Sequence, residues 1–201
     1  MTIGNITTNG LQAGSPGVAF MSLPSYLEVP VVYQEDDFSC VPACIKMVLE
    51  FVRTQNPGAY VPNVETREIG ETISTDELGT SLDDVKKINN KLLKTVPSVE
   101  FVTEMNCSFS EIEKEILQGK PVIAWIKIPY SHSVVVTGLD TTLLIVYYND
   151  PQRGKRQMEM GKFISCWGEV DNTLIKVKVG EKLQRIMPEY VPHTEQRDGE
   201  R

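Results

Sequence analysis

Two cysteines, Cys40 and Cys44, stand at the start of an apolar run in the stretch "FSCVPACIKMVLEF". A thiol in a protein can fill a core, bind a metal, form a disulfide or act as a nucleophile. Pro42 and the apolar spacing after it predict a helix that begins close to Cys40. A thiolate is stabilised at a helix N-terminus, whereas Cys44 falls one turn deeper on the apolar stripe, where ionisation is costly. If one of them is a nucleophile, Cys40 is favoured over core-filling Cys44.

A nucleophilic thiol needs a base that takes its proton and later protonates the leaving group. The chain has two histidines, His132 and His193. His193 lies in a charged stretch near the C-terminus, whereas His132 stands at the mouth of a predicted strand in "PYSHSVVVTG". His132 is therefore the candidate base, and a structural hydrogen bond is the alternative role for such a histidine.

The base needs a partner on its other ring nitrogen, which fixes the tautomer. Asn149 and Asp150 end the next predicted strand, in "YYNDP". If the two strands form a hairpin, antiparallel pairing brings His132 at the start of one beside Asp150 at the end of the other. Asn-Asp-Pro also favours a turn, and the two roles are compatible.

An oxyanion intermediate needs hydrogen-bond donors, and two groups are candidates. One is the backbone N–H of Cys40, and the other is the side-chain amide of Gln34, upstream in the same stretch. A metal site is disfavoured because Cys107 and Cys166 lack ligand-like spacing. We expect no cofactor.

The patterns along the chain predict helices first and then an antiparallel sheet, which is an α+β arrangement. The nucleophile helix should start after an N-cap at Ser39 and stop near "TQNPG". Two helical pieces follow in 63–94, then a strand at "SVEFVTEM", then a helix capped at Ser110. The predicted elements of the second half are the strands "PVIAWIKI", "HSVVVTGLD", "LLIVYYND" and "NTLIKVKVG" and a short helix at "MGKFISCW".

The 201 residues suit one folded domain at 25–180, between a flexible arm at 1–24 and a charged tail at 181–201. The net charge of −7 argues against nucleic acid as a partner. No run approaches the roughly 18 apolar residues of a membrane span, and the N-terminus lacks the features of a signal peptide. The spacing of the four cysteines does not suggest a disulfide framework, so free thiols in the cytoplasm are expected.

Together, the sequence blocks resemble the papain-like cysteine peptidases of the bacteriocin-processing type, which cleave double-glycine leader peptides and have free-standing relatives. The blocks are "QEDDFSCVPACIKMVL", "GTSLDDVKK", "LQGKPVIAWI", "HSVVVTGLD", "YYNDP" and "FISCW", from about Val29 to about Val179. The resemblance implies a papain-like fold with the nucleophile helix packed on the sheet. It also implies Cys40 as nucleophile, His132 as base and acid, Asp150 as its orienting partner and Gln34 as oxyanion donor.

The expected function is hydrolysis of peptide bonds in a peptide or protein substrate by this set of residues. One alternative is a catalytically silent peptide-binding module that uses the same cleft. Another is a thiol-dependent amidase or acyltransferase. Val41 is the reason to retain the alternative of a silent binding module. The family usually has glycine directly after the nucleophile, and a Cβ there could narrow the cleft.

Overall fold

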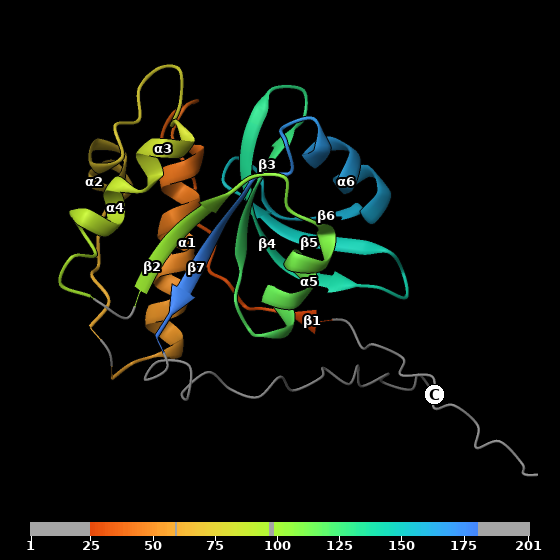
Figure 1. Cartoon of the computed structure of the whole chain (residues 1–201), viewed down its shortest axis with the longest axis horizontal. Helices are drawn as coiled ribbons and strands as arrows, with labels where there is room; N and C mark the ends of the chain where they lie inside the picture. The colour runs from red at the N-terminus through yellow and green to blue at the C-terminus, as the bar shows by residue number, and fades with distance from the viewer. Residues whose placement is uncertain (1–24, 59, 97–98, 181–201) are drawn as a thin grey trace, which may run out of the picture.

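A computed structural model describes residues 25–58, 60–96 and 99–180. In this part of the chain, helices lie on both faces of one antiparallel sheet, an α+β arrangement as predicted (Figure 1). The predicted arm at 1–24 and tail at 181–201 lie outside the described residues, and the domain division stays a prediction.

Helix α1, Cys40–Gln55, carries the predicted nucleophile at its first position. Its apolar stripe is buried, and Pro42 occupies the first turn, where a missing N–H leaves no intrahelical bond unmade. The helix ends in the predicted stretch, where the Asn56 side chain donates to the carbonyl of Val52 at 2.8 Å. Among the described residues, no helix combines the length and apolarity needed to cross a membrane.

Three short helices pack beside α1: α2 (Thr66–Thr72), α3 (Leu82–Val85) and α4 (Lys87–Asn90). The sequence predicted two helical pieces here, and the second is divided into α3 and α4. Ser81 caps α3, because its hydroxyl accepts the Asp84 N–H at 3.2 Å.

Within the described residues the sheet has seven strands, in the order β2-β7-β3-β4-β5-β6, and β1 pairs with β4 outside this path. All pairs are antiparallel. The bounds are β1 Ser25–Tyr26, β2 Val99–Glu104, β3 Val122–Lys127, β4 Ser131–Asp140, β5 Ile145–Asp150, β6 Gly154–Glu159 and β7 Leu174–Val179. Strand β6, "GKRQME", was not predicted, because it is a polar edge strand without apolar alternation.

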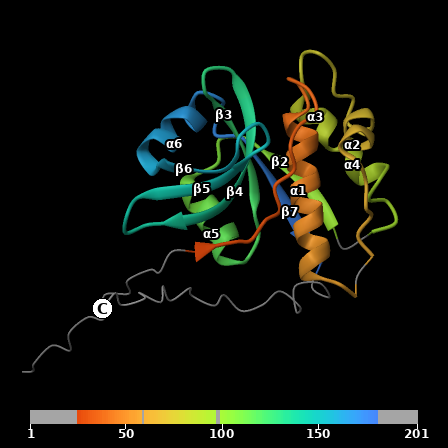
Figure 2. The same ribbon diagram turned by 180° about the vertical axis from the view of Figure 1, so that it is seen from behind.

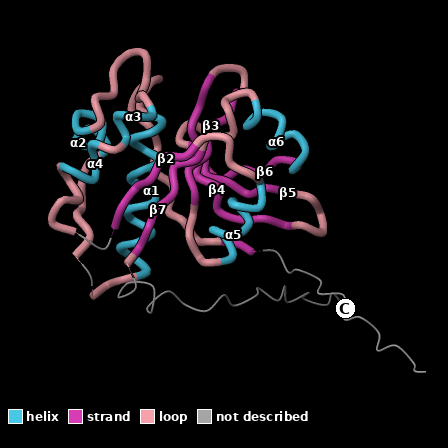
Figure 3. Tube along the Cα trace, in the orientation of Figure 1, coloured by secondary structure: helices cyan, strands magenta, loops and turns pink. Residues whose placement is uncertain are grey.

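Helices α5 (Phe109–Leu117) and α6 (Met160–Gly168) pack on the other side of the sheet from α1 (Figure 3). The predicted cap at Ser110 was wrong by two residues. Ser108 forms the capping box with Glu111, whose carboxylate accepts the Ser108 N–H at 2.7 Å.

Two hydrophobic clusters hold the layers together. One lies between α1–α4 and one face of the sheet, and the other lies between α5, α6 and the opposite face. Strand β4 contributes to both, because Val135 faces the α1 cluster and its neighbours Val134 and Val136 face the other. This strand is therefore fixed from both sides.

The pairing of β4 with β5 sets the position of the candidate base. Val135 pairs with Asn149, so the end of β5 comes beside the start of β4, where His132 lies. A register shift between Val136 and Gly138 bends the strand after this point. The segment that follows β1 runs next to the sheet up to the start of α1 (Figure 2).

Candidate active site

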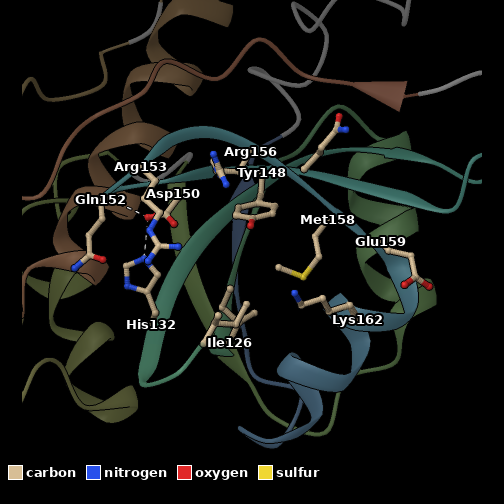
Figure 4. A pocket seen from close by; sticks show the side chains of 12 residues that line it. Ile126, His132, Tyr148, Asp150, Gln152, Arg153, Arg156, Met158, Glu159 and Lys162 are labelled. Carbon is tan, nitrogen blue, oxygen red and sulfur yellow. Dashed lines mark hydrogen bonds and ion pairs between the residues drawn. The ribbon is translucent and has the colours of Figure 1, made fainter.

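The His132 ring is held by Asp150. Its Nε2 atom lies 3.0 Å from the Asp150 Oδ1 atom, and both side chains are almost buried, with 15% and 9% of their surface exposed (Figure 4). The same oxygen accepts the Gln152 N–H at 2.8 Å. With Nε2 engaged by the carboxylate, Nδ1 is the ring nitrogen left to exchange a proton with another group.

The Cys40 thiol is that other group. Burial raises the pKa of Cys40, but a hydrogen bond to His132, the charge of that ring and hydrogen bonds from Ser133 together outweigh burial and lower the pKa. Cys40 is also the first residue of α1, so its own N–H has no intrahelical acceptor and the helix dipole favours the thiolate. Both effects favour the thiolate form of Cys40.

The pKa of His132 is raised, which favours an imidazolium that can pair with the Cys40 thiolate. Burial lowers it, but the hydrogen bonds to Asp150 and Cys40 and their charges raise the pKa of His132 to about 9. Burial raises the pKa of Asp150, but the His132 bond, the Gln152 N–H and the charge of Arg153 outweigh burial and lower the pKa below its usual value. All three shifts favour the charged forms of these groups: thiolate, imidazolium and carboxylate.

Cys44 differs from Cys40 in every respect that matters for reactivity. It is fully buried in the α1 cluster, and its Sγ atom donates to the carbonyl of Ser133 at 3.3 Å. Burial, and then the charges of Cys40 and Asp150, raise the pKa of Cys44 well above its ordinary value. This thiol stays protonated and packs under the site.

The loop before α1 is organised by Ser39. The Ser39 hydroxyl accepts the N–H groups of Glu35 and Asp36 at 3.2 and 3.3 Å. Ser39 occupies the N-cap position as predicted, but its side chain makes no capping bond to the helix, because these upstream amides use it instead. The acidic side chains of Asp36 and Asp37 are exposed to solvent.

Gln34 lies at the start of this loop. Its backbone N–H donates to the carbonyl of Pro151, the residue after Asp150, at 2.9 Å, which ties the loop to the end of β5. Its side-chain Nε2 donates to the Asp36 carbonyl, and its Oε1 is buried without a partner among the described residues. An amide nitrogen carries two hydrogens, so the bond to Asp36 uses only one of them.

If Gln34 is the oxyanion donor that the sequence suggested, replacing it with alanine should lower kcat about 100-fold, because one preorganised donor is lost. Gln34→Glu should cost about as much, since a carboxylate cannot donate. Glu35→Ala, in the same loop and exposed, is the matched control and should keep wild-type rates. Steady-state kinetics measures the effect, and unchanged kcat in both Gln34 variants would remove it from the site.

Two neighbours of the site were not found from the sequence. Ser133 stabilises the Cys40 thiolate by hydrogen bonds and holds Cys44 through its carbonyl. The sequence signal that could have identified Ser133 is a polar residue directly after a candidate base in an otherwise apolar strand. Arg153 acts on Asp150 from the turn after β5, and its effect depends on a conformation that no motif encodes.

Val41 carries its side chain away from solvent. It is 3% exposed and belongs to the α1 cluster. The residue that departs from the usual glycine is thus accommodated by the core.

One further cluster has metal-type ligands. Glu104, Cys107 and Glu111 offer ligand atoms within 4.8 Å of one another. Lys176 already donates to both carboxylates and supplies the positive charge there. We infer no metal site from this cluster.

Solved structures with the same fold include peptide-processing enzymes. A double glycine motif protease from an AMS/PCAT transporter, in complex with the leader peptide, is 21% identical with a TM-score of 0.56, over 78% of this chain and 98% of that one. A protein from Bacillus anthracis assigned to the C39-like peptidases is 17% identical with a TM-score of 0.61, over 79% and 99%. The peptidase domain of Streptococcus ComA, a bi-functional ABC transporter involved in a quorum-sensing pathway, is 21% identical with a TM-score of 0.55, over 74% and 96%.

The fold is therefore that of the C39-type peptidases. A family model matches residues 26–175, most of the described region, and the chain belongs to the Peptidase_C39 like family. No curated protein matches the chain significantly.

Proposed function

We propose that the protein is a cysteine peptidase in which Cys40 attacks the carbonyl carbon of a peptide bond. The thiolate forms a tetrahedral intermediate whose oxygen accepts hydrogen bonds from the Cys40 N–H and the Gln34 amide. His132, held by Asp150, gives its Nδ1 proton to the leaving amine, and a thioester remains on Cys40. His132 then takes a proton from water, the hydroxide attacks the thioester, and the carboxylic acid product leaves as the thiolate is restored.

One observation carries the proposal. His132 is hydrogen-bonded to Asp150, and it lies near enough to Cys40, the first residue of α1, for each side chain to shift the pKa of the other. A structural histidine would need only one of these partners. Membership of the Peptidase_C39 like family adds independent support.

The proposed substrate is a peptide or an extended segment of a protein. One relative with the same fold was solved with a leader peptide bound, which supports peptide binding by this fold. All four cysteines are free, which fits the proposed cytoplasmic location.

A peptide that ends in a Gly-Gly vinyl sulfone tests the proposal, since a structural relative is a double glycine motif protease. We expect a covalent adduct on Cys40, identified by mass spectrometry, and hydrolysis of the matching Gly-Gly peptide. Binding of that peptide with neither adduct nor hydrolysis would favour the silent module. Transfer of the acyl group to an added amine, with little hydrolysis, would favour the acyltransferase.

A further inference from the structure

A cavity of about 290 Å³ lies beside the His132–Asp150 pair, between the ends of β3, β5 and β6 and the first turn of α6 (Figure 4). Its apolar lining comes from Ile126, Ile128, Tyr148 and Met158. The cavity continues the site on the side of His132, and no step of the mechanism above uses it.

Three cations line the cavity: Arg153, Arg156 and Lys162. All three are exposed, and among the described residues none of them lies within 4.0 Å of a carboxylate. Glu159 is the one lining carboxylate besides Asp150, which is engaged by His132. In a chain of net charge −7, three cations without an ion-pair partner around one cavity are a local excess of positive charge.

The chemistry of the proposed reaction says which part of a substrate reaches this cavity. His132 protonates the leaving amine, so the fragment that begins with this amine lies against His132. The cavity shares His132 as part of its wall. Cys40 does not line the cavity, so the part of a bound substrate nearest to the cavity is the stretch that follows the scissile bond.

We propose that this cavity binds a carboxylate on the leaving-group side of the scissile bond, through Arg153, Arg156 and Lys162. The inference rests on the proposed function. Aliphatic carbons of the bound residue pack on Ile126 and Met158, and the carboxylate reaches the cations at the rim. The carboxylate comes from an Asp or Glu side chain or from the C-terminus of a short leaving fragment.

Arg156 and Lys162 are the positions to change, because Arg153 also acts on Asp150. The double variant Arg156→Gln/Lys162→Gln removes two charges and keeps a polar, unbranched side chain at each position. Lys155→Gln is the matched control: it lies next to Arg156 on β6, but its ammonium pairs with Glu28 at 3.2 Å and lies over the Tyr26 ring.

The first probe is a proteome-derived peptide library, with cleaved bonds read by mass spectrometry. We expect Asp and Glu to be enriched in the first two positions after the cleaved bond. A matched pair of synthetic peptides with Glu or Gln at the enriched position then gives the preference as a ratio of kcat/KM. The wild type should prefer Glu about tenfold, and the double variant should lose most of that preference with its Gln rate unchanged.

A second peptide pair has either a free C-terminal carboxylate or a carboxamide two residues after the cleaved bond. It distinguishes a side-chain carboxylate from the C-terminal carboxylate of a short leaving fragment. If only this pair shows the preference, the cavity takes a C-terminus. Cleavage with no preference in either pair, or a preference that Lys155→Gln reduces as much as the double variant, would overturn the inference and leave the peptidase assignment intact. Absence of all cleavage would overturn the proposed function and this inference with it.

Discussion

Cys40→Ala is expected to abolish peptide hydrolysis while the protein stays folded. The variant loses the atom that bonds to the substrate carbonyl, and loss of a nucleophile typically costs about 10⁴- to 10⁶-fold in kcat. Cys40 is only partly buried and makes its hydrogen bonds to His132 and Ser133, so the core loses little. Hydrolysis rates and a thermal melt on the same preparation measure both effects.

Cys44→Ala is the matched control, one turn further along the same helix. It removes a buried sulfur from the α1 cluster and should cost about 1 to 2 kcal/mol of unfolding free energy. Activity below the melting transition should stay within a few-fold of the wild type. Equal loss of activity in both variants, with both folded, would contradict the division of roles between the two thiols.

His132→Ala should be the second large effect, with a loss of about 10³-fold or more in kcat/KM. The variant has no group to protonate the leaving amine, and Cys40 loses the hydrogen bond and the charge that lower its pKa. His193→Ala, at the chain's other histidine, serves as control and should leave the rate unchanged. Similar losses in both variants would show that the assay reports something other than the proposed site.

The elements predicted best are those with a strong local pattern. Helix α1 was predicted because Pro42 and a continuous apolar stripe mark its start and its buried face. The cap of α5 was misplaced because Ser108 and Ser110 are both followed by glutamate three residues later. Local pattern could not choose between them; the packing of Ile112 and Ile116 against the sheet sets the helix phase.

The candidate site was predictable where it depends on strand order and less so where it depends on packing. The sequence predicted that a hairpin would bring Asp150 beside His132. The structure has this pairing of β4 with β5 and the contact between the two side chains. The contribution of Ser133 and the cations around the cavity depend on which strands and turns meet in space. Strand β6, which supplies Arg156, has no apolar alternation and was missed entirely.

The pH dependence of Cys40 alkylation tests the central claim most directly. Iodoacetamide reacts with the thiolate, and Cys40 is followed by tandem mass spectrometry that separates it from Cys44 on the same peptide. In the wild type the thiolate forms at a lowered pKa and is paired with His132 up to about pH 9. Alkylation should therefore remain fast at pH values below the ordinary thiol pKa of about 8.5.

In His132→Ala only the Ser133 hydrogen bonds still offset the effect of burial on Cys40, so the pKa of its thiol should rise. Alkylation should then become slow at neutral pH and increase only above about pH 8.5. The account predicts this upward shift of the profile. Identical profiles in the two proteins, or a wild-type profile of an ordinary thiol, would contradict a thiolate–imidazolium pair at Cys40 and His132.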